Sequence, residues 1–479
     1  MPGMKTISFV DRKYGSVFRS SAVFYYRNDG NIRTTISFLD YWKFKRDLTV
    51  AAIASVRDMD GNLLSRTQID FGNGAVINFR PAADSVIEGS IEIEIFSTKN
   101  MVIPYAAVVA AYESRRGLSL VHSYGRHYYP HEIEEGKTIT HGREGCWTLR
   151  DAAGVRSFCV FHNGGGTYPE QTARLSVAND GGEIREAEIR LPALKPYQTV
   201  SLCPREHIRD LVSFLGGGCG HASLRFEVCN SFTRMLIGNE QVNGDDFQVT
   251  HSNFDYRQHG TDLVDAAEQV AYMVVPAMKG QRRRLIVYPQ SFPGAYEVSN
   301  PGSGFHRKFQ SGEPLFADVA EGTQTFRFRR LDGPFPTRLV TAIELRQRDG
   351  LLPTECSLGV LTVLQPRKRY WWGICSATEV DSLLVLHDLK EIYGGIAPND
   401  KLEIALYSSR SREPARVSLT ADRLAEFERG IPFSEVFRNA AEHLDGDYGY
   451  FTLFHQYGGL TAYTLASRPS GSLSFEHGF

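Results

Sequence analysis

Short runs in which apolar and polar residues alternate recur along this chain, and this pattern limits its possible folds more than any other. The clearest runs are residues 90–96 (SIEIEIF), 186–191 (EAEIRL), 223–228 (SLRFEV), 325–329 (TFRFR) and 401–407 (KLEIALY). Successive side chains of a strand point to opposite faces, so such alternation predicts half-buried strands. Asp-Gly pairs at 60–61, 180–181, 332–333 and 349–350 predict tight turns between strands. The pattern predicts an all-β protein built from sandwiches or barrels.

Composition also favours strands over helices. Aromatic residues make up 11% of the 479 residues, and aromatic and β-branched side chains suit a pleated, half-buried surface. Helical patterns are few. The best is residues 204–215 (PREHIRDLVSFL), which opens on Pro and is followed by Gly216. Residues 420–429 and 434–444 form a second helical pair.

Two kinds of strand recur and indicate an internal repeat. The first kind is aromatic-rich and is interpreted as the opening of a unit: residues 23–26 (VFYY), 158–161 (FCVF), 285–288 (LIVY) and 404–407 (IALY). The second ends in histidine and is interpreted as the close of a unit: residues 118–122 (LSLVH), 247–251 (FQVTH), 383–387 (LLVLH) and 473–477 (LSFEH). These histidines would converge if the units were arranged around an axis. A histidine that caps a turn is the simpler interpretation.

The repeat predicts four tandem β-sandwich units, immunoglobulin-like in size and strand rhythm, with a few short helices between strands. The expected units are residues 1–140 with a His-rich connector, 141–262 with an inserted helix, 263–392, which is basic, and 393–479 with inserted helices. A division into two large sandwiches would use the same strands. Linkers rich in Ser and Pro are missing between units, which favours packed neighbours over separate beads.

Several classes of protein lose support from the sequence. The seven cysteines are scattered without a CxxC pair, so neither a disulfide framework nor a zinc ribbon is indicated. The amino terminus lacks the apolar segment of a signal peptide, and the longest apolar runs are too short to span a bilayer. We therefore expect a cytoplasmic protein with no transmembrane segment, and export without a cleaved signal stays an alternative. Searches for GxxxxGK[ST], for GxGxxG after a strand, for GxSxG and for HExxH find nothing.

Histidines gather in the connectors after the first two units. Imidazoles beside carboxylates are ligands that Zn²⁺ and Fe²⁺ sites use, and they can also act as general acids and bases. A metal site in these connectors would draw on His122, His127, His131, His141, His251, Asp255 and His259. Pro130 separates His127 from His131, so the two are not expected to share a helix face. A loop packed at a domain interface, with no metal, is the competing interpretation.

Positive charge is concentrated in residues 279–372, which hold 15 Lys and Arg against 8 Asp and Glu in a chain of net charge −2. The candidate anion- or partner-binding residues in this segment are Arg282, Arg283, Arg284, Arg327, Arg329, Arg330, Arg367, Lys368 and Arg369. Arginine suits planar, bidentate contacts to carboxylate and phosphate. A solvated basic face, or pairing with acidic parts of the same protein, is the alternative.

The sequence favours a non-enzymatic β-sandwich protein for binding or assembly, expected to form a homo-oligomer, with an enzyme as the alternative. Its basic third unit would contact an anionic partner or an acidic neighbouring subunit. We expect no cofactor and no nucleic-acid partner, with self-association or a protein or anionic polymer as the partner. The first alternative is a metal-dependent (Zn or Fe) or acid–base enzyme at the His-rich junctions. The second is a protein that binds or processes carbohydrate through Trp371 or Trp372, which would point to opposite faces of a strand.

Overall fold

A computed structural model describes residues 18–81, 87–101, 107–133, 140–252, 270–278, 281–289, 293–333, 335–336, 339–346, 350–360, 368–377 and 381–478 of the chain. Within these ranges the protein consists almost entirely of antiparallel β-sheets with a few short helices, which confirms the predicted all-β class. Eight four-stranded sheets form four sandwiches, and one small two-stranded sheet joins two of them.

The first two sandwiches contain the following strands. The first sandwich has β1 (Phe18–Asn28), β2 (Arg33–Leu39), β3 (Ala51–Asp58), β4 (Leu63–Ile69), β5 (Val76–Phe79), β6 (Ile87–Ser97), β7 (Val109–Glu113) and β8 (Leu118–His122). The second has β10 (Thr140–Leu149), β11 (Val155–His162), β12 (Gln171–Asn179), β13 (Ile184–Leu191), β14 (Thr199–Leu202), β15 (Gly220–Cys229), β17 (Leu236–Gln241) and β18 (Phe247–His251). Between them, β9 (Gly125–His127) pairs with β16 (Ser231–Thr233) and links the two sandwiches.

The last two sandwiches have the same number of strands. The third has β19 (Val270–Val275), β20 (Arg282–Val287), β21 (Ala295–Asn300), β22 (Phe305–Gln310), β23 (Leu315–Val319), β24 (Gln324–Arg330), β25 (Thr341–Arg346) and β26 (Thr354–Leu358). The fourth has β27 (Tyr370–Cys375), β28 (Asp381–Asp388), β29 (Lys401–Tyr407), β30 (Ala415–Thr420), β31 (Ile431–Pro432), β32 (Gly449–His455), β33 (Leu460–Ser467) and β34 (Leu473–His477).

All four sandwiches share one strand order. Numbered within each sandwich, one sheet runs first–sixth–third–fourth and the other fifth–second–seventh–eighth. Each core lies between the two sheets: in the second sandwich, for example, Phe161 of one sheet stacks on Phe226 of the other at 3.9 Å between ring centroids. An immunoglobulin constant domain has seven strands, so the immunoglobulin-like description stays a prediction about general architecture.

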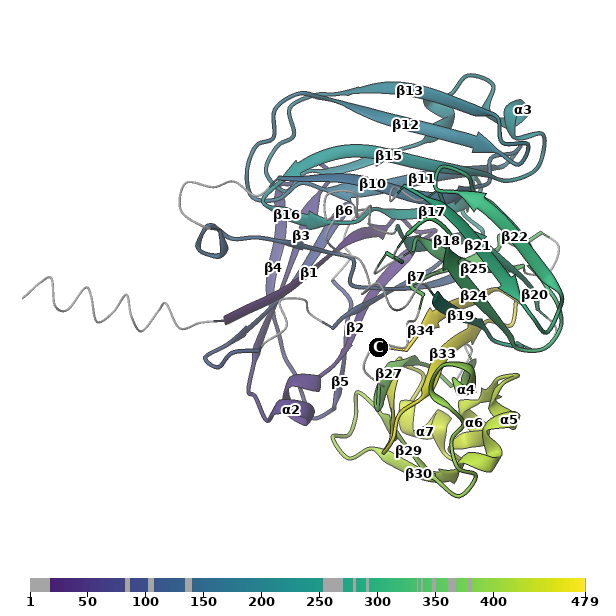
Figure 1. The fold of residues 1–479 in the computed structure, drawn as a ribbon. Coiled ribbons are helices and arrows are strands. Elements are labelled where there is room, and N and C mark those ends of the chain that lie inside the picture. The colour runs from purple at the N-terminus through teal and green to yellow at the C-terminus, as the bar shows by residue number, and fades with distance from the viewer. Residues whose placement is uncertain are drawn as a thin grey trace, which may run out of the picture.

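The four sandwiches form a closed ring. The eighth strands meet in cyclic order, since β8 contacts β18, β18 contacts β26, β26 contacts β34, and β34 contacts β8 (Figure 1). In that view the purple first sandwich faces the green third across the molecule, and the teal second lies opposite the yellow-green fourth. The first hydrophobic core extends beyond its own sandwich, because Tyr448 and Tyr450 of the fourth and Phe247 of the second pack into it.

The predicted repeat matches strands that do not all hold the same position in their sandwiches. Three of the four histidine-ended strands, β8, β18 and β34, are eighth strands of their sandwiches. The fourth, residues 383–387, lies in β28, which is the second strand of the last sandwich. The aromatic-rich strands are likewise not equivalent, since they fall in β1, β11, β20 and β29.

The strand pairing bears on the unit boundaries at residues 140, 262 and 392. Residue 140 is the first residue of β10, and residue 262 is outside the described residues. A boundary at 392 would separate β27 and β28 from β32 and β33, with which they pair. The division of the chain into units at these residues stays a prediction.

The helices are shorter than their sequence patterns indicate. The segment 204–215 divides into a 3₁₀ turn, η2 (Pro204–Glu206), and a helix, α3 (Leu211–Leu215), separated at Asp210, whose φ is +54°. The later helical segments contain η3 (Ala421–Arg423), α5 (Leu424–Phe427), α6 (Phe433–Val436) and α7 (Ala440–Leu444). The remaining short elements are α2 (Tyr41–Arg46), η1 (Pro130–Glu132) and α4 (Lys390–Tyr393).

The alternating run 90–96 lies in β6, but this strand is buried on both faces. Its glutamates are covered because Arg19 of β1 lies over them, with Nη2 2.6 Å from Glu92 and Nε 2.8 Å from Glu94. His127 of β9 closes the same cluster, with Nδ1 3.3 Å from Glu92. The prediction of a half-buried strand is therefore wrong here, because opposite charges from neighbouring strands satisfy the buried carboxylates.

Candidate functional site

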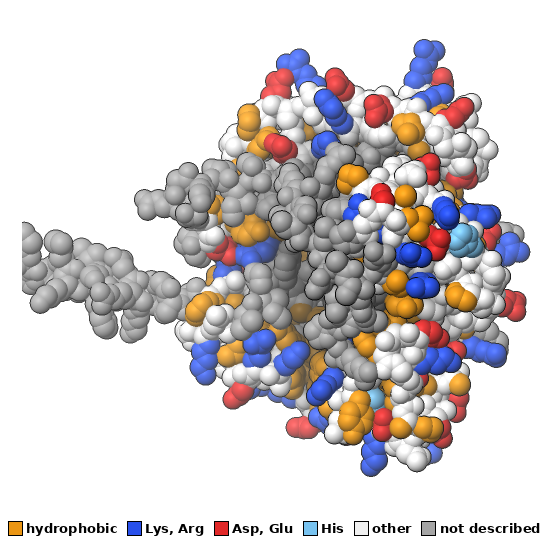
Figure 2. All heavy atoms as spheres, in the orientation of Figure 1, with side chains coloured by type: hydrophobic (Ala, Val, Ile, Leu, Met, Phe, Trp, Pro, Cys, Tyr) orange, Lys and Arg blue, Asp and Glu red, His pale blue; other side chains and the backbone are white. Residues whose placement is uncertain are grey.

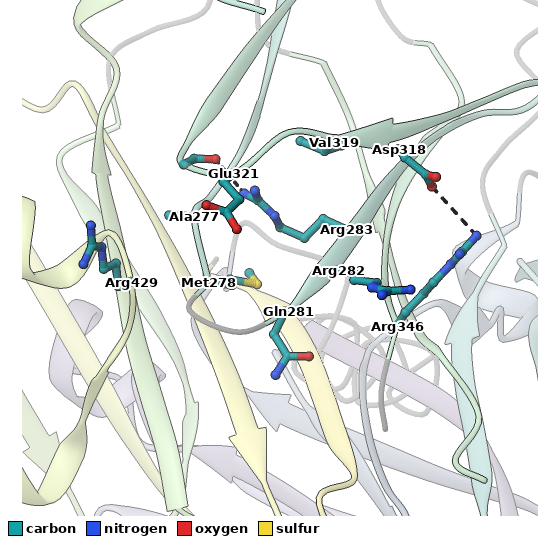
Figure 3. Close-up of a pocket in the computed structure, with 11 residues that line it drawn as sticks. Ala277, Met278, Gln281, Arg282, Arg283, Asp318, Val319, Glu321, Arg346 and Arg429 are labelled. Carbon is teal, nitrogen blue, oxygen red and sulfur yellow. Dashed lines mark hydrogen bonds and ion pairs between the residues drawn. The ribbon is translucent and has the colours of Figure 1, made fainter. Parts of the chain in front are cut away.

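A cavity of about 670 Å³ lies where the third sandwich meets the fourth. Its lining comes from the start of β20, the ends of β23 and β25, and the residue after Glu428 of the fourth sandwich (Figure 3). The lining residues that carry charge are Arg282, Arg283, Arg346, Arg429, Asp318 and Glu321. Four guanidinium groups against two carboxylates leave this cavity with an excess of positive charge.

Arg282 and Arg346 lie directly opposite each other on the adjacent strands β20 and β25. Opposed residues of an antiparallel pair have Cβ atoms roughly 5 Å apart, so two like charges at this position repel each other. Arg346 has acidic neighbours, with Nε 3.4 Å from Glu344 and Nη2 3.8 Å from Asp318. The backbone of Arg282 pairs with β25, but its guanidinium makes no hydrogen bond or ion pair with a described residue. An anion between the two guanidinium groups would relieve the repulsion.

Arg429 reaches the cavity from the fourth sandwich (Figure 3). It follows α5, at a point where Thr323 Oγ1 of the third sandwich donates a hydrogen bond to Glu428 Oε2 at 3.3 Å. Its guanidinium also has no partner among the described residues. The cavity therefore exposes two uncommitted guanidinium groups that come from different sandwiches.

The guanidinium of Arg283, unlike those of its neighbours in the cavity, is occupied by backbone carbonyl oxygens. The side chain is buried and donates hydrogen bonds to the carbonyl oxygens of Pro276 (2.5 Å), Ala320 (2.5 Å) and Gly322 (2.8 Å). These bonds occupy the guanidinium and hold two loops together at the floor of the cavity. We therefore assign Arg283 to the support of the cavity and not to ligand contact.

The other basic residues singled out from the sequence lie elsewhere. Arg284 faces the second sandwich, with Nη1 3.2 Å from Cys219 Sγ. Arg327 and Arg329 are exposed on β24, and Arg330 pairs with Asp332 at 2.8 Å. Lys368 Nζ donates to the Gly478 carbonyl oxygen at 3.2 Å and Arg369 is exposed, whereas Arg367 is outside the described residues. Figure 2 shows basic and acidic side chains interspersed over the described part of one face. In the described part of the chain, these basic residues therefore lie at separate positions.

Of the four arginines that line the cavity, the sequence predicts Arg282 and Arg283 but not Arg346 and Arg429. Arg346 lies beyond the local RRR cluster and is brought to Arg282 only by the pairing of β20 with β25. Arg429 comes from another sandwich altogether. The only local signal for Arg429 is its position before Gly430, which ends a predicted helix. Neither residue could be connected with Arg282 without the tertiary structure.

Three of the four strand-end histidines do converge. The rings of His122 and His251 lie 4.4 Å apart, and those of His122 and His477 lie 4.9 Å apart, measured between centroids. Each of the three closes an eighth strand, and Leu358 occupies the equivalent register in the third sandwich. His387 is not equivalent: it lies on β28 with Nδ1 3.0 Å from Glu428.

Glu476 joins this histidine cluster, which we define as His122, His251, His477 and Glu476. Its Oε1 lies 3.1 Å from His122 Nδ1. Burial raises the pKa of Glu476 to about 7 and lowers the pKa of His477 to about 4. Burial, together with the charge of Arg234, lowers the pKa of His251 well below its ordinary value. The imidazoles of His251 and His477 are therefore neutral at pH 7.

Of the remaining residues of the sequence-predicted metal site, the structure places only the side chain of His127, which lies apart from this cluster. His127 is buried against Glu92 and Tyr197. Asp255 and His259 are outside the described residues, as are the side chains of His131 and His141. Glu476 was not foreseen, although it directly precedes a predicted strand-end histidine.

The structure gives little support to a nucleophilic cysteine or to carbohydrate binding by Trp371 or Trp372. Burial raises the pKa of the Cys219 thiol to about 11, which disfavours a nucleophilic thiolate. The six cysteines whose side chains are described are all free. Trp371 is buried, and Trp372 stacks on Tyr41 at 6.5 Å between ring centroids. These contacts make both tryptophans part of packed interfaces.

No family model matches the chain, and no curated sequence matches it. In the part of the chain that the structure describes, no helix has the length and apolar character needed to cross a membrane.

Proposed function

We propose that this chain is a non-enzymatic protein for binding or assembly, and that the cavity between its third and fourth sandwiches holds an anionic group of the partner. The observation that carries the proposal is the opposition of Arg282 and Arg346 in a cavity that Arg429 also lines. Guanidinium groups bind carboxylate and phosphate oxygens through paired hydrogen bonds, with roughly twice the strength of neutral ones.

The chemistry of the cavity favours a compact anion with several oxygens. Arg282 and Arg429 line the same cavity from different sandwiches, so a ligand that reaches both would bridge the third and fourth units. Asp318 and Glu321 repel anionic groups at one part of the lining, which favours a ligand whose charge is local and not an extended polyanion. A phosphate or carboxylate group at the end of a partner chain fits these requirements, and so does an acidic side chain of a second copy.

Isothermal titration calorimetry with inorganic pyrophosphate, at low and at high salt, tests the proposal. The double variant Arg282→Ala/Arg429→Ala is expected to weaken binding at least tenfold, because each charged hydrogen bond contributes roughly 1.5–3 kcal/mol. The matched control is Arg327→Ala/Arg329→Ala, which removes two exposed arginines of the same sandwich that do not line the cavity. Equal binding by both double variants, or no binding by the natural chain, would overturn the proposal.

Sedimentation velocity on the same three proteins tests assembly. If the anionic group belongs to a second copy of the chain, the natural protein forms a salt-sensitive oligomer. The Arg282→Ala/Arg429→Ala variant then dissociates into monomers while the control variant does not. A salt-sensitive oligomer that survives the cavity variant would show that assembly uses another surface.

A metal-dependent or acid–base enzyme is the second candidate, and the convergence of His122, His251 and His477 is the observation that favours it. His122, His251 and Glu476 are 8%, 4% and 5% exposed. The His477 side chain is 27% exposed, so a substrate would reach this residue and not the three buried groups, and a structural role for this cluster is better supported than a catalytic one.

A further inference from the structure

We propose that His122, Glu476 and His477 form a Zn²⁺ site that joins the first and fourth sandwiches. One ligand atom from each of the three side chains lies within 4.8 Å of the other two. A tetrahedral Zn²⁺ with ligand bonds of about 2.0–2.1 Å holds its ligand atoms roughly 3.4 Å apart. The separation of 3.1 Å between His122 Nδ1 and Glu476 Oε1 is close to that value.

The ligands come from the first and the last sandwich of the ring. His122 is the last residue of β8 in the first sandwich, and Glu476 and His477 end β34 in the fourth. These two strands are in contact, and Ser474 Oγ of β34 accepts a hydrogen bond from the Leu120 backbone N–H of β8 at 2.8 Å. A bound ion would therefore fasten sandwiches that are far apart in the sequence and adjacent in space.

The chemistry of this ligand set suits Zn²⁺. Two imidazoles and one carboxylate are a ligand combination that zinc proteins use. A buried carboxylate is costly without a positive partner, and a divalent cation supplies one. Glu476 is buried and the His477 side chain is 27% exposed, and three protein ligands leave the fourth tetrahedral position to His251 or to water. Because the ligands come from two sandwiches, the ion would stabilise the ring.

His251 lies beside this site as an outer neighbour. Its Nδ1 lies 2.9 Å from the Ser252 carbonyl oxygen and 3.1 Å from Arg234 Nη1, which leaves Nε2 as the nitrogen able to face the metal. Because its ring is 4.4 Å from that of His122, His251 can orient this ligand by packing or complete the tetrahedron after a small rotation. The third sandwich contributes no imidazole, since Leu358 takes the equivalent position.

The test uses the full chain, stripped of metal with a chelator and titrated with Zn²⁺ in a calorimeter and with Co²⁺ in an absorption spectrometer. We expect about one ion per chain, a d–d spectrum typical of four-coordinate Co²⁺, and a rise in the melting temperature on binding. Two single variants test the ligands: Glu476→Gln, which keeps the size of the side chain, and His477→Ala. Each is expected to weaken Zn²⁺ binding at least 100-fold.

The matched control is His306→Ala, which removes an exposed histidine whose Nε2 lies 3.0 Å from Glu297. This variant should bind Zn²⁺ as the natural chain does. Circular dichroism of the metal-free variants checks that Glu476→Gln is folded, so a loss of binding can be assigned to the ligand. Failure of the natural chain to bind Zn²⁺ or Co²⁺ would overturn the site, and so would unchanged binding by both cluster variants. The basic cavity is separate from the cluster, so either proposal can fail alone.

Discussion

His221 shows what one buried imidazole costs this protein. It lies on β15 with its ring 5.3 Å from Tyr288 and 4.2 Å from Phe316, and it is 2% exposed. Neither ring nitrogen has a hydrogen-bond partner among the described residues. Burial lowers the pKa of His221 to about 3, so the folded protein keeps this side chain neutral at pH values where the unfolded chain binds a proton.

This difference predicts a pH-dependent loss of stability. The folded pKa lies below the unfolded value of about 6.5, so the stability is fully present above pH 6.5 and is lost as pH falls toward 3. Between pH 6.5 and pH 5 the contribution of His221 should fall by about 2 kcal/mol. His221→Leu should reduce the acid sensitivity by that amount in urea unfolding. His306→Leu, which changes an exposed histidine, should leave the slope unchanged. Parallel pH profiles for the natural chain and His221→Leu would contradict the assignment.

At the scale of elements, local alternation and turn signals predict strands well, because a half-buried strand needs nothing beyond its own sequence. They fail where a second layer covers the outer face. Run 90–96 looks half-buried, yet Arg19 and His127 from other elements bury its glutamates. The helix predicted over 204–215 breaks at Asp210, because the chain turns there through a left-handed conformation. The sequence could predict that His122 and His477 converge only if the units surround an axis, because their contact depends on closure of the ring.

The eighth strands of the ring meet through side-chain hydroxyls where no backbone ladder joins them. Ser119 of β8 is 1% exposed, accepts a hydrogen bond from Val249 N–H of β18 at 3.0 Å and donates one to the Phe247 carbonyl oxygen at 3.1 Å. Its hydroxyl therefore takes the place of a ladder partner between two sandwiches. The same strand is tied to β34 on its other side through Ser474.

Ser119→Ala is expected to lower the free energy of unfolding by about 1–3 kcal/mol, because the Val249 N–H is left buried without an acceptor. Ser37→Ala is the matched control: Ser37 is 0% exposed, but its hydroxyl has no partner among the described residues. The control should change stability by less than about 0.5 kcal/mol. Chemical denaturation followed by tyrosine and tryptophan fluorescence measures both values. Equal effects of the two substitutions would show that the Ser119 hydroxyl does not stabilise the contact between β8 and β18.

At the scale of the whole molecule, ring closure joins the first and fourth sandwiches into one packing unit. Tyr448 and Tyr450 belong to the fourth sandwich and pack into the core of the first. The Tyr450 hydroxyl also donates a hydrogen bond to the Ser37 carbonyl oxygen at 2.8 Å. Since the apolar core continues across this boundary, we expect the two sandwiches to unfold together and not as independent domains.

Gly74 allows the backbones of the first and fourth sandwiches to approach each other closely. A Cβ atom at this position would lie 1.9 Å from the Ser409 carbonyl oxygen, which is backbone and cannot rotate away. The next residue, Ala75, donates its N–H to the Ser408 carbonyl oxygen at 3.0 Å, so the strain would fall on a hydrogen-bonded contact. Gly74→Ala should therefore lower stability by about 1–3 kcal/mol and separate the calorimetric transition of the fourth sandwich from that of the first. Gly312→Ala, where a Cβ meets nothing within 4 Å, should keep a single transition. If Gly74→Ala melts in one transition at the natural temperature, ring closure does not depend on this contact.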